Sequence, residues 1–323
     1  MHRRVAAATV ALVVTVVLMP LTGGRAGAVS SGPPPSPSYA GDFPDPAVLW
    51  DAGTQLYWAY ATQAGSTNVQ SMSSKDLVHW STIADALPTL PAWAAPGHTW
   101  APSVARFGAT WVMWYTTRHA YSGRQCLSVA TASAPGGPFV DNSTGPAVCQ
   151  FNNGGSIDAN IFVAGGRAYL LWKSDDNALG NITHLWGSTL DATGTVVGSP
   201  TLLLSQDAAW QAPAVEGPTM VAARGSYYLF YGASDWASTS AGIGYATCSG
   251  PLGPCRDRAT WGPWLGSRGS ALGPSGPDVF TDASGATRLA YHAWNGCVGY
   301  PSCARALWIG YLSFGFFGPA LGH

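Results

Sequence analysis

The segment Asp45-Pro46-Ala47-Val48 is the first of five similar phrases that recur at nearly constant spacing along the chain. The other four are Ala101-Pro102-Ser103-Val104, Asp158-Ala159-Asn160-Ile161, Gly217-Pro218-Thr219-Met220 and Gly276-Pro277-Asp278-Val279. Their second residues, at positions 46, 102, 159, 218 and 277, are separated by 56, 57, 59 and 59 residues. A fixed period of this length is typical of stacked or radially arranged sheet units.

Each phrase is followed by a short turn and an aromatic-rich apolar run. The runs lie at 56–60, 111–115, 168–172, 227–231 and 289–292. Gly, Pro, Asn and Asp interrupt the segments between them, which is the pattern of antiparallel strands joined by tight turns. We therefore expect an all-β fold, a single five-bladed β-propeller over residues 39–323 with four strands in each blade. A β-sandwich would not produce five equal periods, and a β-helix usually has a shorter repeat.

The amino terminus has the features of an export signal. Residues 1–28 combine a basic start, an apolar stretch over 5–19 and the small residues Ala26-Gly27-Ala28. An uncleaved membrane anchor is the alternative, but the apolar stretch is shorter than the roughly 20 residues that a span needs. Residues 29–38 are rich in Ser and Pro, so we expect a disordered linker there. The mature protein is then secreted and has no membrane association.

Charge and composition exclude several kinds of partner. The chain has 15 basic and 16 acidic side chains, a formal net charge of -1, and therefore no basic field for nucleic acid or an anionic membrane. Its 15 Trp and 13 Tyr suit the apolar faces of a neutral carbohydrate, and we expect a monomer.

The six cysteines fall as neighbours in sequence. An even number in an exported chain favours disulfides, and we expect Cys126–Cys149, Cys248–Cys255 and Cys297–Cys303 among the 15 connectivities that six cysteines allow. A zinc site is the alternative, but the chain has no CxxC or His-rich spacing to support it.

Three acids lie at or beside the starts of phrases. Asp45 and Asp158 open their copies, and Glu216 directly precedes Gly217. The residue before a proline favours extended backbone, and proline is tolerated at the first position of a strand. We therefore interpret the phrases as entries into the innermost strand of each blade. Equivalent positions of different blades face one central cavity, so the three acids are expected to converge.

Convergent acids suit glycoside cleavage, which requires a proton donor for the leaving oxygen and an opposing carboxylate. Glu216 has the longer side chain and apolar neighbours, and its raised pKa would suit a general acid. Asp45, held between two prolines, would be the general base, and Asp158 would keep Glu216 protonated and oriented. The alternative for each Asp beside a proline is a cap on turn amides.

Four short motifs carry a resemblance to glycoside hydrolase family 43. They are Phe43-Pro44-Asp45-Pro46, Thr99-Trp100-Ala101-Pro102, Ser156-Ile157-Asp158-Ala159 and Val215-Glu216-Gly217-Pro218, and the run 169–175 is similar as well. The resemblance covers about residues 39–315. It implies a five-bladed β-propeller, hydrolysis with inversion, and base, pKa-modulating and acid roles for Asp45, Asp158 and Glu216. The family acts mainly on α-L-arabinofuranosides and β-D-xylosides of plant cell walls.

Further site residues are expected around these acids. Phe43 and Trp100 are candidates for sugar contacts, with packing inside the blades as the alternative for each. The resemblance implies a substrate contact for Arg305, and it places His292 near a calcium-centred site on the propeller axis. A buried, hydrogen-bonded histidine is the alternative, because calcium prefers oxygen ligands. The chemistry itself requires no cofactor. Lys173 and Asp175 are interpreted as rim residues or as parts of solvated turns.

Two departures from the family pattern bear on specificity. The chain ends soon after the fifth repeat, which disfavours the β-xylosidases that carry an additional β-sandwich. Gly217 stands where endo-arabinanases more often have Ala. We therefore expect an α-L-arabinofuranosidase, with endo-arabinanase or β-xylosidase as the alternatives within the family. A non-catalytic carbohydrate-binding propeller and a retaining enzyme acting on fructans are the alternatives outside it.

Overall fold

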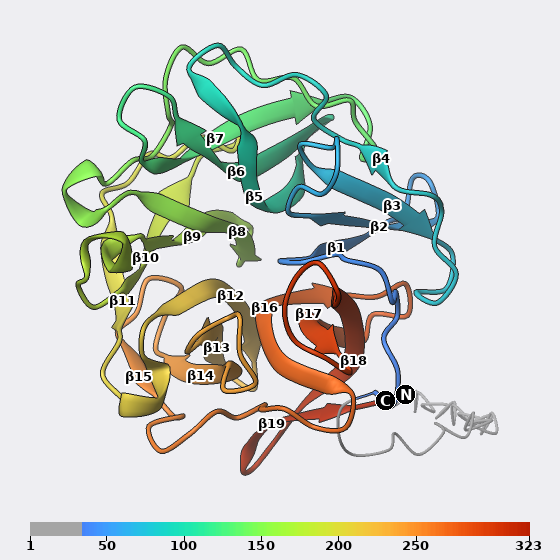
Figure 1. Ribbon diagram of the computed structural model, residues 1–323, viewed down its shortest axis with the longest axis vertical. Helices are drawn as coiled ribbons and strands as arrows, with labels where there is room; N and C mark the ends of the chain where they lie inside the picture. The colour runs from blue at the N-terminus through green and yellow to red at the C-terminus, as the bar shows by residue number, and fades with distance from the viewer. Residues whose placement is uncertain (1–33) are drawn as a thin grey trace, which may run out of the picture.

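The computed structural model describes residues 34–323, and almost all of their regular structure is β-strand. The expected signal peptide (1–28) and the first half of the expected linker lie outside these residues. Five antiparallel sheets surround a common centre (Figure 1). The sequence-based expectation of an all-β, five-bladed β-propeller is therefore confirmed. No helix in the described part is long and apolar enough to cross a bilayer.

Each blade is a meander whose strands pair in chain order from the centre outward. Blade one contains β1 (Ala47–Asp51), β2 (Leu56–Ala61), β3 (Gln70–Ser74) and β4 (Ala84–Asp85). Blade two contains β5 (Ala94–Phe107), β6 (Thr110–His119) and β7 (Gln125–Ala132). Blade three contains β8 (Ser156–Ala164), β9 (Arg167–Ser174), β10 (His184–Leu190) and β11 (Thr201–Ser205).

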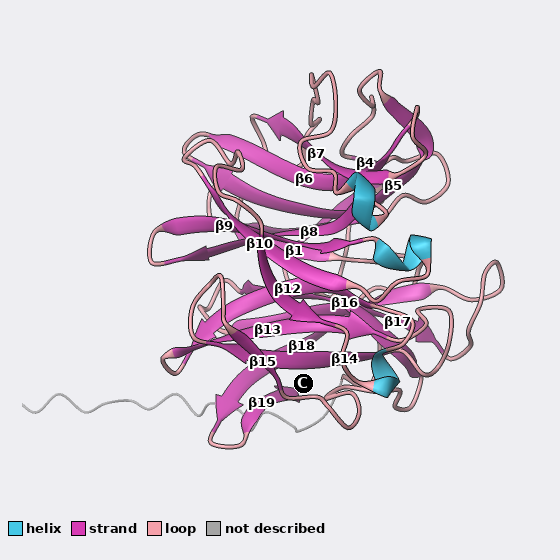
Figure 2. Cartoon of the chain, turned by 90° about the vertical axis from the view of Figure 1, so that its left-hand side faces the viewer, coloured by secondary structure: helices cyan, strands magenta, loops and turns pink. Residues whose placement is uncertain are grey.

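The remaining two blades follow the same plan. Blade four contains β12 (Val215–Ala223), β13 (Ser226–Ala233), β14 (Gly242–Cys248) and β15 (Cys255–Asp257). Blade five contains β16 (Ala271–Thr281), β17 (Thr287–Asn295), β18 (Arg305–Gly315) and β19 (Gly318–Gly322). Three short 3-10 helices, η1 (Phe151–Asn153), η2 (Asp176–Leu179) and η3 (Ala209–Gln211), lie on one side of the molecule (Figure 2).

Blade two differs from the expected four strands. The chain after β7 forms only isolated bridges to it, Leu127 to Val148 and Thr131 to Val140, where the other blades have a fourth strand. The segment between these residues contains Pro135 and Pro138, which lack the N–H that a ladder needs. A full outer strand is therefore not formed there.

The aromatic runs form the second strand of every blade, and both faces of these strands are buried. In β13, Leu229 packs toward blade three, whereas its neighbours Tyr228 and Phe230 pack toward blade five. Successive side chains of a strand point to opposite faces of the sheet, so a blade between two others buries both sets. Five apolar clusters fill the five junctions between blades. This explains why the runs are continuously apolar rather than alternating.

The start of the described chain closes the ring. Tyr39 pairs with Leu307 of β18, and the Phe43 N–H donates to the Arg305 carbonyl at 2.9 Å. The Ser38 N–H also donates to the Leu307 carbonyl, at 2.8 Å. The segment that precedes blade one is thus added to blade five, and Figure 1 shows both ends of the described chain at this blade.

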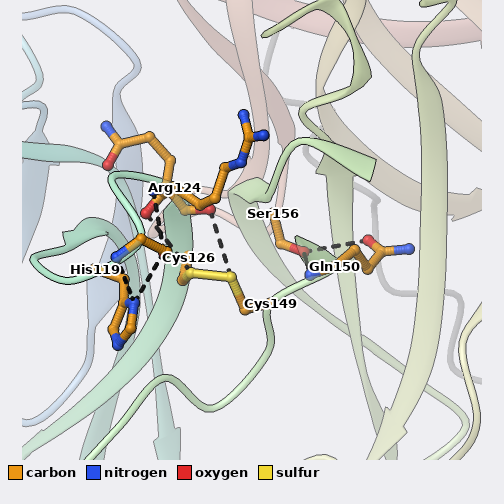
Figure 3. The surroundings of a disulfide bond; sticks show 8 residues. His119, Arg124, Cys126, Cys149, Gln150 and Ser156 are labelled. Carbon is orange, nitrogen blue, oxygen red and sulfur yellow. Dashed lines mark hydrogen bonds between the residues drawn. A yellow bond between two sulfur atoms is a disulfide. The ribbon is translucent and has the colours of Figure 1, made fainter. Parts of the chain in front are cut away.

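All three expected disulfides are present: Cys126–Cys149, Cys248–Cys255 and Cys297–Cys303. The first joins β7 of blade two to the loop that leads into β8 (Figure 3). Beside it, Gln150 accepts hydrogen bonds from the Ser156 hydroxyl at 3.2 Å and from the Trp172 indole at 2.7 Å. These contacts hold the beginning of the strand that carries Asp158.

Candidate active site

The five repeated phrases contain a left-handed residue at the same position. Asp45, Ala101, Asp158, Gly217 and Gly276 have φ values of 53°, 40°, 59°, 55° and 56°. Glycine adopts this conformation freely and Asp tolerates it, whereas most other residues are strained there. Backbone strain of this kind is concentrated at functional sites in proteins.

The phrases lie inside the inner strands rather than at their entries, except in blade one, where β1 begins at Ala47. In blade four, Glu216 pairs with Gly232 and Thr219 pairs with Phe230, so the inner strand has one extra residue. Blades two, three and five have the same register shift. The left-handed residue is the extra one, and in blades two, four and five the proline after it cannot donate to the ladder. This corrects the expectation that the phrases mark strand starts.

The bulge explains how acids at two different repeat positions converge. In a regular strand, neighbouring residues such as Ile157 and Asp158 would face opposite sides. Here both line one cavity of about 430 Å³. Asp45 and Asp158 reach the cavity from the left-handed position, whereas Glu216 reaches it from the position before. The three predicted acids are therefore brought together, from blades one, three and four.

Asp45 lies among donors and cations. The Thr62 hydroxyl donates to its Oδ2 at 2.7 Å, and Nη1 of Arg305 is 3.6 Å from its Oδ1. Burial raises the pKa of this carboxyl, but Arg305 and the Thr62 hydrogen bond outweigh it, so the pKa lies below its ordinary value. Asp45 is therefore ionised at neutral pH, as a general base must be.

Asp158 and Glu216 have the opposite tendency. Burial, together with the charge of Glu216, raises the pKa of Asp158 to about 8. Burial also raises the pKa of Glu216, although Lys173, whose Nζ is 3.4 Å from Oε2 of Glu216, opposes this. Neighbouring carboxyls in a desolvated site cannot all ionise. The Asp158–Glu216 pair therefore retains a proton at neutral pH, which is what an acid catalyst requires.

Side chains on the second strands, or directly after them, hold the left-handed residues of the next blade. We call these contacts interblade caps: a side chain of one blade accepts a backbone N–H from its neighbour. Thr62 accepts from Ala101 at 3.0 Å, and Thr116 accepts from Asp158 at 3.1 Å. At the junction with blade four, the Asp158 carboxylate itself accepts the Gly217 N–H, at 2.9 Å. Further interblade caps join neighbouring inner strands, where Asp278, Ser103 and Thr219 accept from Val48, Ile161 and Val279.

His292 is the interblade cap between blades five and one. Its Nδ1 accepts the Asp45 N–H at 3.0 Å, so a neutral ring carries its proton on Nε2. Burial lowers the pKa of His292 to about 3, so the ring is neutral. Nε2 is buried and has no hydrogen-bond partner in the described structure.

These features do not fit the calcium site expected at His292. An Nε2 that carries a proton offers no lone pair to a cation, and calcium prefers six to eight oxygen ligands. Among residues 34–323, no group of three or more His, Cys, Asp and Glu side chains is arranged to hold a metal ion.

The expected substrate contacts are placed differently from one another. Trp100 and Arg305 line the cavity. Phe43 does not: its ring is fully buried and packs edge-on against Tyr39 at 6.0 Å. The hydrogen bonds that add residues 38–43 to blade five carry Phe43 into the junction between blades one and five. Phe43 is therefore a core residue, and the expected sugar contact is corrected.

Lys173, Thr62 and Trp236 are among the cavity residues to which the sequence assigned no site role. Lys173, expected at the rim or in a solvated turn, is 1% exposed and contacts Glu216 and Asp175. Thr62 and Lys173 occupy the same register position in their blades. Each lies two residues after the residue that pairs with the inner strand two positions beyond its left-handed residue. No fixed count from the aromatic runs marks both, since Thr62 lies two residues after the run 56–60 and Lys173 lies one residue after the run 168–172. Trp236 lies in the loop between β13 and β14, outside the repeated phrases and the aromatic runs, so no sequence signal indicated it.

Trp236 and Arg305 form one side of the cavity mouth. The guanidinium of Arg305 lies 4.7 Å from the Trp236 ring centre, and its Nε donates to the Tyr300 hydroxyl at 3.0 Å. Tyr300 in turn donates to Asp42 at 2.7 Å. Trp236 remains 42% exposed. An indole beside a fixed guanidinium is suited to stacking and hydrogen bonding with a sugar.

Comparisons with known proteins agree with this geometry. The chain is 26% identical over 296 residues to a protein of Aspergillus clavatus named probable arabinan endo-1,5-alpha-L-arabinosidase A, covering 83% of this chain and 87% of the relative. It is 29% identical over 237 residues to the beta-D-galactofuranosidase xynD of Aspergillus niger, covering 68% and 64%.

Solved structures show the same architecture. A thermostable family-43 glycoside hydrolase superposes with a TM-score of 0.78 at 25% identity, over 90% of this chain and 95% of that one. An endo-arabinase from Bacteroides thetaiotaomicron gives a TM-score of 0.71 at 17% identity, over 87% and 97%, and shows the shared fold. Residues 34–314 match the family described as Glycosyl hydrolases family 43. The chain belongs to glycosyl hydrolase family 43.

Proposed function

We propose that this protein hydrolyses α-L-arabinofuranosidic bonds of plant cell-wall polysaccharides with inversion of configuration. The observation that carries the proposal is one cavity containing an ionised Asp45 and a proton-retaining Asp158–Glu216 pair. Inverting hydrolysis requires a base for water and an acid for the leaving oxygen. A neutral sugar suits this cavity, because its acids are already balanced in part by Lys173 and Arg305.

The roles follow from the environments. Asp45 takes a proton from a water molecule as that water attacks the anomeric carbon. Glu216 gives its proton to the glycosidic oxygen as the bond to the anomeric carbon breaks. Asp158 and Lys173 adjust the acidity of Glu216 from two sides, one as a carboxyl that shares the proton and one as a fixed cation. The products are an inverted sugar and a free hydroxyl on the remaining chain.

A screen on aryl α-L-arabinofuranoside, aryl β-D-xyloside and debranched arabinan tests the substrate. We expect the wild type to release arabinose. The variants Asp45→Asn and Glu216→Gln should both lose this activity, while their melting temperatures stay near that of the wild type. Proton NMR of the first product should show the inverted anomer. Retention of configuration, or full activity in either variant, would remove the assigned mechanism.

Endo-action on arabinan is the second candidate, and the names of the Aspergillus relatives favour it. The two candidates differ in product size. An exo-acting arabinofuranosidase releases only arabinose from debranched arabinan, whereas an endo-arabinanase first releases oligosaccharides and lowers the viscosity quickly.

Tight sugar binding by calorimetry without turnover on any of these substrates would instead support a carbohydrate-binding propeller. We also infer that the protein is exported, since three disulfides suit an oxidising compartment. Amino-terminal sequencing of protein recovered from culture medium tests cleavage after residue 28.

A further inference from the structure

Thr62 differs from the other interblade caps because the oxygen that accepts the backbone N–H also donates a hydrogen bond to a catalytic carboxylate. Its Oγ1 accepts the Ala101 N–H at 3.0 Å, and its hydroxyl donates to Oδ2 of Asp45 at 2.7 Å. A hydroxyl has one proton to donate and two lone pairs that accept. Because the Ala101 N–H occupies one lone pair of the Thr62 oxygen, the Thr62 O–H remains to donate to Asp45. The donor direction is therefore set by the backbone of the next blade.

The position of Thr62 is itself fixed. Its backbone N–H donates to the Pro44 carbonyl at 3.0 Å, next to Asp45, and the side chain is only 8% exposed. A β-branched side chain has few rotamers in extended backbone. Three contacts therefore fix Thr62. Its backbone N–H bonds to the segment that carries Asp45, and its hydroxyl bonds to the next blade and to the carboxylate.

The other carboxylate oxygen of Asp45 is left without such a partner. Within residues 34–323, no protein hydrogen bond reaches Oδ1, whose near neighbours are Nη1 of Arg305 at 3.6 Å and Nδ1 of His292 at 3.3 Å. The Nδ1 lone pair is already engaged with the Asp45 N–H. Oδ1 is therefore the oxygen left to accept a hydrogen bond from a water molecule.

We propose that Thr62 is a positioning residue for Asp45: it fixes Oδ2 through a hydroxyl whose direction is set by Ala101, and so presents Oδ1 to the attacking water. This inference rests on the proposed function, because it takes Asp45 as the general base. It predicts an effect on turnover rather than on substrate binding, since a carboxylate that rotates loses the water but not the sugar contacts.

The chain offers a matched control for the loss of an interblade cap. Thr219 is a buried Thr whose Oγ1 accepts the Val279 N–H at 3.2 Å, and it does not line the catalytic cavity. Thr219→Val and Thr62→Val each replace a hydroxyl by a methyl and leave one buried N–H without its acceptor. Only the second removes a donor from Asp45.

The test compares steady-state kinetics of the wild type, Thr62→Val, Thr62→Ser and Thr219→Val on the aryl glycoside that the wild type cleaves. We expect kcat of Thr62→Val to fall by about tenfold to a hundredfold, as for loss of a hydrogen bond to a charged group, with KM changed less than about twofold. Thr62→Ser should restore kcat to within about threefold, because it keeps the hydroxyl. The melting temperature of Thr219→Val should fall like that of Thr62→Val, but its kcat should equal that of the wild type.

Two further measurements separate failure of this inference from failure of the proposed function. If Asp45→Asn is inactive and Thr62→Val is fully active, the inference is overturned and the function stands. If Asp45→Asn is active, the role of Asp45 is wrong and the inference falls with it. A crystal structure of Thr62→Val supplies a readout that needs no substrate: we expect the Asp45 carboxylate to turn away from its present position. An unmoved carboxylate overturns the inference even if no substrate is found.

Discussion

The replacement Asp278→Asn tests how the charge at the centre of the propeller affects stability. Asp278 lies in β16, two residues after Gly276, and is 8% exposed. Its Oδ2 accepts the Val48 N–H at 2.8 Å and its Oδ1 accepts from Nδ2 of Asn160 at 3.1 Å, but no Lys or Arg of the described residues is paired with it. Burial raises the pKa of Asp278 to about 6. Two neutral hydrogen bonds do not compensate fully for the lost hydration of the charge.

The size of the effect follows from the pKa. A rise from the ordinary 3.8 to about 6 is about 2 pKa units, or about 3 kcal/mol. Because the folded protein binds this proton more tightly than the unfolded chain, the group stabilises the fold below pH 3.8. That contribution is lost as the pH rises through about 6. Asn resembles the protonated acid, so it avoids the loss and keeps an acceptor for the Val48 N–H.

We expect Asp278→Asn to be more stable than the wild type by up to about 3 kcal/mol at pH 7.5, which is about 6 °C in melting temperature at about 2 °C per kcal/mol. At pH 4 the two proteins should melt together. Differential scanning calorimetry at both pH values measures this. A gain of equal size at pH 4 and pH 7.5, or a loss at pH 7.5, would refute the reasoning.

Asp282→Asn is the control with the opposite sign. Asp282 is also buried, but Ser284 and Arg288 more than offset the effect of burial, and its pKa is lowered. Its ionised form stabilises the fold above its unfolded pKa, and this contribution is lost as the pH falls through the folded pKa. The replacement should therefore lower the melting temperature at pH 7.5 and have less effect in acid.

Three other predictions concern the site. The kcat/KM of the wild type should fall as the pH rises through about 8, where the Asp158–Glu216 pair loses its proton, and a profile that is flat to pH 9.5 would contradict this. Gly276→Ala should lower the melting temperature more than Gly285→Ala. Both glycines have positive φ, but only a Cβ at position 276 would lie against His292, 2.7 Å from its Nδ1. Equal losses in the two variants would show that contact to be unimportant. Dialysis against a chelator should leave the melting temperature and kcat unchanged, and a loss restored by calcium would overturn the neutral-cap role of His292.

The sequence by itself determined the architecture and the meeting of the acids. A period of 56–59 residues with an aromatic run in each unit specifies five similar blades, because each blade must bury both faces against its neighbours. Once the blades close a ring, equivalent positions share one cavity. Asp45, Asp158 and Glu216 were found in this way. The disulfides were predictable as well, because each pair is close in sequence and lies within one blade or beside one strand start.

Only the tertiary structure decided how those acids are held. Thr62 meets Ala101 39 residues away, and His292 meets Asp45 247 residues away. Such contacts form between the second strand of one blade and the bulge of the next, and no local pattern reports them. The burial of Lys173 and of Phe43 depends in the same way on residues of the neighbouring blades. Periodicity places the backbone of every blade, but the protonation and orientation of a buried side chain depend on whatever the adjoining blade presents to it.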